Sequence, residues 1–228
     1  MNRQEYEIIE KHMLYCMQDS AHDKYHIYRV LYATINIAKH EKNVDYDVLI
    51  SACFLHDIGR KKQFEDLNLC HAQIGADMAF EFLLSINWNQ QKALHVKDCI
   101  SSHRYRGDNQ PQSIEAKILF DADKLDATGA MGIARTLLYE GQITEPLYIL
   151  DEGGNIITDG GGAEISSFFQ EYNYKLKKVY DTFYTEHAKQ LAAIRQKTAM
   201  HFYDGLYEEI SKNYNAGMNE MADLLRDS

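Results

Sequence analysis

The chain has 228 residues, 45% hydrophobic and 25% charged, which is enough to bury a sizeable core, and its formal net charge is −10. That charge argues against a nucleic-acid polymer or an anionic membrane surface as a partner, because both carry dense negative charge. Only two prolines, Pro111 and Pro146, interrupt the chain, which leaves room for long helices and argues against an all-β domain. We therefore predict an all-α fold, and the length fits a single domain of residues 1–228 or one domain with an appendage.

The cysteines and the apolar runs indicate a cytoplasmic protein. No CxxC spacing occurs, and no apolar run approaches the roughly 18 to 20 residues that a membrane span requires. The first residues are too polar for a signal peptide. We expect a reducing compartment, with most of the cysteines acting as small buried hydrophobic side chains.

Apolar residues at helical spacing predict the first helices of the chain. The first spans residues 4–17, and the second runs through residue 38 with Asp23 as a plausible N-cap. His26 falls in the first turn of this second helix. Taken alone, such a histidine is more often a hydrogen-bonded or solvent-facing side chain than a ligand.

The third predicted helix opens at residues 45–47, is almost wholly apolar, and ends at His56-Asp57. An ionised aspartate buried there without a partner would cost several kcal/mol, which a bound cation would offset. Imidazole and carboxylate together suit a divalent ion such as Mn, Fe, Ni, Co, Zn or Mg, but a doublet needs further ligands from elsewhere. The alternative is a helix-terminal histidine and a solvated aspartate before Gly59.

Two more histidines stand at predicted helix ends. His71 opens one helical pattern, and His103 follows another that spans about residues 90–102. Both can face a cleft. His95, in the middle of the second pattern, is better interpreted as structural.

The next predicted helix begins at Ser113 and carries three carboxylates within six residues, Asp121, Asp123 and Asp126. Asp121 and Asp123 lie about 200° apart around a helix, so only one of them can share a surface with the other ligands. Asp123 and Asp126 share a face. Such charges on an apolar helix are costly unless a cation satisfies them.

The Gly-rich stretch 141–163 is predicted to be a long loop, with a short hairpin or a lid as possible forms. Residues 164–228 return to helical spacing. Their aromatic side chains are better interpreted as a core or as the surface of a possible homodimer than as a ligand box.

In this order, the motifs resemble those of the HD-domain superfamily of metal-dependent phosphohydrolases, in particular its small stand-alone bacterial members. The resemblance rests on His-Ile-Tyr-Arg-Val, Leu-His-Asp-Ile-Gly and Ala-Asp-Lys-Leu-Asp-Ala-Thr-Gly-Ala, within residues 22–135. It implies an all-α helical bundle whose metal-site core covers about residues 20–140, followed by the loop and the C-terminal helices.

The resemblance also implies a ligand set. His26, His56, Asp57 and Asp123 would bind a first metal, with Asp121 as the fallback for Asp123. Some members hold a second ion with two further histidines and the doublet's aspartate, and His71 and His103 occupy those places. We therefore expect one or two divalent ions.

The activity expected from this resemblance is hydrolysis of a phosphate ester or anhydride by metal-activated water, with Asp57 at the ions and Asp126 or Asp121 orienting the water. Basic residues beside the ligands suggest a small phosphorylated substrate, by inference a nucleotide. The side chains assigned to it are Arg29, Arg60, Lys61, Arg104 and Lys124. Members acting on deoxynucleoside monophosphates have an acidic residue shortly after the doublet, where this chain has Arg60-Lys61-Lys62, so their catalytic carboxylate is not carried over.

Two competing functions remain open at this stage. A di-iron oxygenase can use the same His, His-Asp, His, His, Asp set, and iron content with oxygen consumption would reveal it. A non-catalytic nucleotide-binding protein would keep the fold and bind without turnover.

Overall fold

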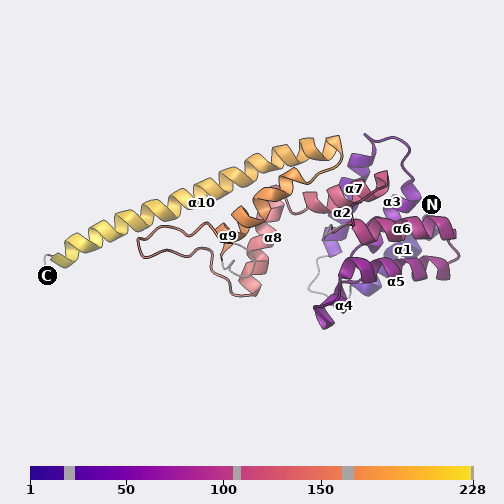
Figure 1. Ribbon diagram of the computed structural model, residues 1–228, viewed down its shortest axis with the longest axis horizontal. Coiled ribbons are helices and arrows are strands. Elements are labelled where there is room, and N and C mark those ends of the chain that lie inside the picture. The colour runs from indigo at the N-terminus through magenta and orange to yellow at the C-terminus, as the bar shows by residue number, and fades with distance from the viewer. Residues whose placement is uncertain (18–23, 105–108, 161–166, 227–228) are drawn as a thin grey trace. The chain divides into compact units, whose positions relative to one another are not determined.

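The structure is a computed structural model that describes residues 1–17, 24–104, 109–160 and 167–226. Within these ranges the regular elements are helices, and the β-type pairing is a single bridge between Leu150 and Ile156 (Figure 1). This confirms the all-α prediction. None of the helices in the described part of the chain combines the length and the apolar character needed to span a membrane.

Contacts group the chain into two compact units. Unit 1 comprises Met1–Asp126 with Phe183–Lys189, and unit 2 comprises Ala127–Thr182 with Gln190–Ser228. The helices of unit 1 are α1 (Arg3–Cys16), α2 (Lys24–Ala38), α3 (Tyr46–Leu55), α4 (Arg60–Glu65), α5 (His71–Ser85), α6 (Gln90–Ser102) and α7 (Ile114–Leu125). The bounds of α1, α2, α3 and α6 agree with the sequence-based ranges to within a few residues, whereas α4 was not predicted.

Polar side chains fix where several of these helices begin. Asp45 accepts hydrogen bonds from the backbone of residues 47 and 48, and Ser113 accepts one from residue 116. Each satisfies backbone N–H groups that the first turn of a helix leaves without partners. The predicted N-cap Asp23 lies outside the described residues.

Helix α3 is the centre of unit 1. It contacts α1, α2, α5, α6 and α7, and Leu49, Phe54 and Leu55 are fully buried (Figure 1). Burial of each such side chain contributes about 1.5–3 kcal/mol. The helix therefore delivers the doublet that follows it into the interior of the unit.

Two glycines let the turn after the doublet lie against α5. A Cβ at Gly59 would meet the carbonyl oxygen of His71 at 2.3 Å and the backbone nitrogen of Gly75 at 2.6 Å. The contact is between two backbones, so neither side can move aside cheaply. It holds the start of α5, and with it His71, beside the doublet.

Unit 2 contains α8 (Gly129–Gln142), α9 (Phe168–Tyr174), the 3-10 helix η2 (Leu176–Asp181) and most of α10 (Glu186–Arg226), whose first turn belongs to unit 1. Phe168, Phe169 and Tyr172 are buried in its core, and the Tyr172 and Tyr203 rings stack with centroids 4.3 Å apart. These aromatic residues therefore form core, as predicted, although Phe202 keeps 41% of its surface exposed.

The stretch after α8 contains a short hairpin-like turn. The Asp151 carboxylate accepts hydrogen bonds from the backbone of Gly153 and Asn155, beside the bridge between Leu150 and Ile156. The turn belongs to unit 2, and its proposed role as a lid stays a prediction.

Replacing Gly59 tests the close backbone approach. Gly59→Ala should lower the free energy of unfolding by about 1–3 kcal/mol, because the methyl group overlaps backbone atoms. Denaturant unfolding followed by circular dichroism measures the change. Gly205→Ala is the matched control, since a Cβ there meets nothing within 4 Å and helix propensity favours alanine. Equal stability of the two variants would contradict the packing argument.

Candidate metal centre

Four imidazoles and two carboxylates of unit 1 converge from different helices. His56 and His103 are the C-cap residues of α3 and α6, while His71 is the first residue of α5. His26 comes from the first turn of α2, Asp123 from α7, and Asp57 from the turn after α3. All are buried except Asp123, whose side chain is 14% exposed.

Each imidazole is oriented through its Nδ1 atom. His56 Nδ1 lies 2.7 Å from the Cys53 carbonyl oxygen, and His103 Nδ1 lies 2.6 Å from that of Ile100. A carbonyl oxygen only accepts, so the proton must be on Nδ1, and Nε2 is left with a lone pair.

The other two imidazoles follow the same arrangement with side-chain acceptors. His26 Nδ1 lies 2.7 Å from Asp126 Oδ2, and His71 Nδ1 lies 2.7 Å from Gln63 Oε1. Arg104 Nη1 is also 3.2 Å from His71 Nδ1, but the Gln63 oxygen is closer and accepts a hydrogen bond from the Nδ1–H group. Four Nε2 atoms therefore point inward, as in metal sites where an outer acceptor fixes the tautomer.

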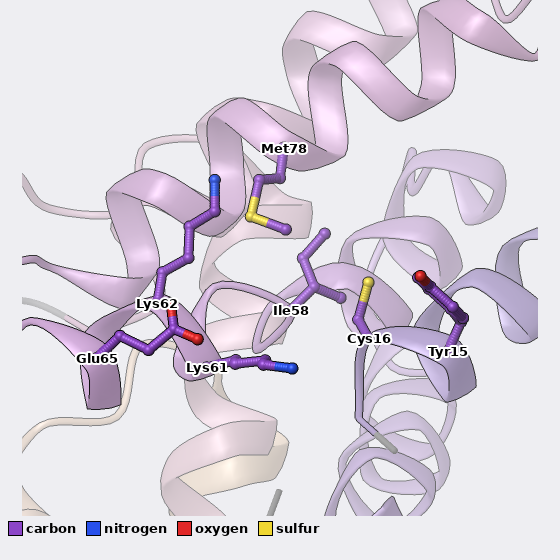
Figure 2. A pocket seen from close by; sticks show the side chains of 7 residues that line it. All are labelled: Tyr15, Cys16, Ile58, Lys61, Lys62, Glu65 and Met78. Carbon is purple, nitrogen blue, oxygen red and sulfur yellow. The ribbon is translucent and has the colours of Figure 1, made fainter. Parts of the chain in front are cut away.

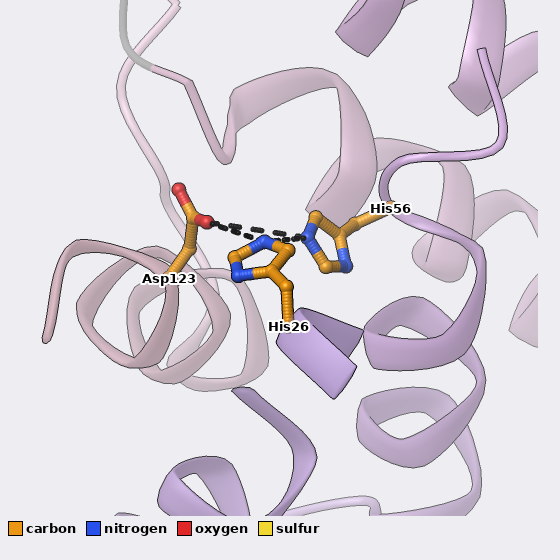
Figure 3. A group of neighbouring side chains, drawn as sticks. All are labelled: His26, His56 and Asp123. Carbon is orange, nitrogen blue, oxygen red and sulfur yellow. Dashed lines mark hydrogen bonds and ion pairs between the residues drawn. The ribbon is translucent and has the colours of Figure 1, made fainter. Parts of the chain in front are cut away.

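The first group of donors is His26, His56 and Asp123 (Figure 3). The two Nε2 atoms are 3.3 Å apart, and Asp123 Oδ1 lies 3.4 Å from that of His26 and 4.0 Å from that of His56. The prediction that Asp123 and Asp126 share a face is confirmed, because both contact the His26 ring.

The second group is Asp57, His71 and His103. Asp57 Oδ1 lies 3.5 Å from His71 Nε2 and 3.8 Å from His103 Nε2. Both Asp57 Oδ1 and His71 Nε2 are buried without a hydrogen-bond partner. The other oxygen, Oδ2, lies 3.6 and 3.7 Å from the Nε2 atoms of His26 and His56, so one carboxylate faces both groups.

These residues fit a divalent cation. Donors bound at about 2.1 Å to one ion lie roughly 3–4 Å from each other, which is the spacing seen here. Orphaned buried acceptors such as Asp57 Oδ1 are costly unless a cation satisfies them. The two groups could hold one ion each, with Asp57 between them.

The pKa values of His71 and His103 agree with a lone pair on each Nε2 atom. Burial lowers the pKa of His103 to about 4 and, together with Arg60, lowers that of His71 to about 3, so both are neutral near pH 7. Burial works to raise the pKa of Asp57, but His56 and Arg60 outweigh it and lower it.

His26 is the exception. Burial works to lower its pKa, but hydrogen bonds with Asp123 and Asp126 outweigh this effect and raise it to about 9. Without a metal, a proton at His26 therefore supplies the positive charge between these carboxylates.

Basic side chains surround the donors. Arg29 makes two contacts with Asp126, at 2.7 and 3.0 Å, while Arg60 Nε lies 2.8 Å from Asp57 Oδ2. Lys124 Nζ lies 3.1 Å from Asp123 Oδ2. Lys61, whose binding to substrate stays a prediction, lines a cavity to which none of the six donors contributes.

Asp121 occupies a different place from that expected of a ligand. Its fully buried carboxylate accepts hydrogen bonds from the backbone of Tyr184 (2.9 Å) and from the backbone and hydroxyl of Thr185 (2.7 and 2.6 Å). It anchors the start of α10, and Asp123 alone of the pair joins the donor groups. Asp126 is likewise engaged, by His26 and Arg29, so its contacts suit positioning rather than water activation.

Sequence reasoning missed Gln63, which accepts the His71 Nδ1 proton. Gln63 could have been predicted from its position three residues after Arg60, because residues three apart lie on the same face of the helix that follows the doublet. The sequence could not show that the Cys53 and Ile100 carbonyls accept hydrogen bonds from His56 and His103, because every residue carries a backbone carbonyl.

Comparisons with known proteins show what the chain is similar to. Residues 24–128 match the HD domain family. The chain is 28% identical over 195 residues to the uncharacterized protein YpgQ of Bacillus subtilis, covering 85% of this chain and 86% of that protein. A crystal structure of YpgQ in complex with ADP superposes with a TM-score of 0.70 at 24% identity, over 90% of this chain and 95% of that one. An HD-superfamily hydrolase from Bacillus thuringiensis gives a TM-score of 0.68 at 27% identity, over 91% and 97% of the two chains.

Metal binding should depend on pH through His26. Because its pKa is raised to about 9, a metal must displace this proton at lower pH. The apparent affinity should therefore fall about tenfold per pH unit below 9 and level off above it. Competition with a chromophoric chelator between pH 6.5 and 9.5 measures this, and a flat profile would refute the role of His26.

Asp121 and Asp123, two residues apart on α7, form a matched pair. Asp123→Asn should weaken metal binding by more than the roughly 10–100-fold expected for an outer partner. Asp121→Asn should bind metal as the parent does but lose about 1–3 kcal/mol of stability, because its amide cannot accept every hydrogen bond of the carboxylate. The opposite pattern would make Asp121 the ligand.

Proposed function

We propose that this chain, whose residues 24–128 match the HD domain family, is an HD-superfamily metal-dependent phosphohydrolase acting on a small phosphorylated substrate, a nucleotide. The observation that carries the proposal is the convergence of four imidazole Nε2 atoms and two carboxylates, with Asp57 facing both donor groups. A divalent ion there would lower the pKa of bound water and neutralise charge on phosphoryl oxygens.

The donors take distinct roles in this proposal. His26, His56 and Asp123 would hold one ion, His71 and His103 would hold a second, and Asp57 faces both groups. Asp126 and Gln63 orient the histidine rings. Each accepts a hydrogen bond from an Nδ1–H group, which leaves the Nε2 atom of that ring available to a metal. With these residues in place, hydrolysis adds the water oxygen to phosphorus and breaks the bond to the leaving oxygen, which takes up a proton.

The basic side chains bind the phosphoryl group. Arg29, Arg60 and Lys124 keep 28%, 32% and 22% of their side-chain surface exposed while each contacts a site carboxylate. They can thus reach a ligand and still balance the negative charge of the aspartates. Guanidinium groups suit phosphate because their planar N–H groups match its oxygens. Arg104, beside His71, is the fourth candidate.

A nucleotide is the substrate class favoured by the comparison with YpgQ, a 28% identical protein whose structure was solved with ADP. A phosphate-bearing ligand also agrees with the positive residues around the donors of a chain whose net charge is −10. The base and the number of phosphates stay open.

The test is an anaerobic assay of phosphate and pyrophosphate release from a nucleotide panel, using protein stripped of metal and reloaded with Mn, Co, Ni or Mg. His56→Ala and Asp57→Ala should bind no metal and show no turnover. His95→Ala is the matched control: His95 contacts Glu115 rather than the donors, so the variant should keep both properties.

Two outcomes would contradict the proposal. Iron-dependent oxygen consumption without phosphate release would support the oxygenase. Nucleotide binding with no turnover in any metal would support a binding protein.

A further inference from the structure

A cavity in unit 1 lies beside the doublet, and none of the metal donors lines it. Its volume is about 420 Å³, within the size range of small-molecule sites. Figure 2 shows the side chains that surround it, which come from α1, the turn after α3, α4 and α5. They are Tyr15, Cys16, Ile58, Lys61, Lys62, Glu65 and Met78.

Helix α4 separates this cavity from the metal centre and contributes a different face to each. Arg60 and Gln63, three residues apart, contact Asp57 and His71. Lys61, Lys62 and Glu65 line the cavity. Residues three or four apart share a helix face, so this division follows from the geometry of the helix.

The lining of the cavity defines the chemistry of a ligand. Ile58, only 3% exposed, and Met78 supply apolar surface, and the Tyr15 ring is 72% exposed and available for stacking. Two lysines against one glutamate give the lining a net positive charge. An apolar or aromatic body carrying an anionic group matches both features.

We propose that this cavity is an effector site for a small aromatic anion, and that α4 couples its occupancy to the metal donors. The second part of this proposal, the coupling through α4, rests on the metal centre proposed above. Since Ile58 follows Asp57 directly, and Arg60 and Gln63 touch Asp57 and His71, a ligand that shifts α4 also shifts these contacts. Gln63 Nε2 additionally donates to the Leu69 carbonyl at 3.0 Å, which ties α4 to the segment leading into α5.

The coupling must act in both directions. A ligand that changes the affinity for the metal has its own affinity changed by the same factor when metal binds. This reciprocity separates an effector site from a cavity that merely accepts small molecules.

The test uses naphthalene-1-sulfonate, an aromatic anion with no phosphate bond to hydrolyse, and full-length protein loaded with diamagnetic Zn²⁺. The chain has eight methionines, so ¹³C-methyl labelling gives few signals, and Met78→Leu assigns the reporter. We expect a saturable shift of the Met78 signal. Zn²⁺ affinity, measured by chelator competition, should change about fivefold or more when the probe is saturating.

Matched charge reversals test the site. Lys62→Glu should weaken probe binding about tenfold or more, whereas Lys39→Glu, an exposed lysine outside the cavity, should leave it unchanged. The proposal is overturned if the Met78 signal does not move, if Lys62→Glu binds the probe like the parent, or if Zn²⁺ affinity is the same with and without probe. A failed nucleotide assay would leave the Met78 titration intact, so the two proposals can fail separately.

Discussion

The buried Asp57 carboxylate is the constraint on which the arrangement of unit 1 depends. Its Oδ1 atom has no hydrogen-bond donor, and the imidazole nitrogens around it present lone pairs. Such a cluster of acceptors is unfavourable in a protein interior unless positive charge enters it. Arg60 and the proton on His26 provide part of that charge, and a divalent ion would provide the rest. The site is therefore built to need a cation.

The ends of helices α3, α5 and α6 place three of the histidines around Asp57. His56 and His103 are both C-cap residues, and each donates its Nδ1 proton to the carbonyl three residues earlier. The last carbonyls of a helix lack i+4 amide partners, so they have lone pairs left for these side-chain hydrogen bonds. The Ile100 carbonyl accepts from both the backbone N–H and the Nδ1 atom of His103. His71 lies at the opposite kind of end, where no carbonyl is free, and it uses the Gln63 side chain instead. The choice of acceptor thus follows from which end of a helix each histidine occupies.

Helices α7 and α4 each present one face to the metal donors and another face to a different part of unit 1. On α7, Asp123 and Asp126 face the donors, while Asp121 faces the start of α10 and holds it with three hydrogen bonds. On α4, Arg60 and Gln63 face the donors, while Lys61 and Lys62 line the cavity beside the doublet. In both helices, residues on one face contact the donors while residues on another face contact a different part of unit 1.

The sequence by itself determined the all-α fold and the bounds of most helices of unit 1, because helical periodicity is a local property. It also placed histidines and aspartates at predicted helix ends, and the resemblance of these motifs to the HD-domain superfamily implied the ligand set. It also showed that Asp121 and Asp123 could not share a face. Only the tertiary structure decided which of them joins the donors, since that depends on α10, more than 60 residues away. The same holds for Gln63, for the engagement of Asp126 by His26 and Arg29, and for Lys61 lining a cavity of its own: each depends on which distant atoms the packing of helices places opposite a side chain.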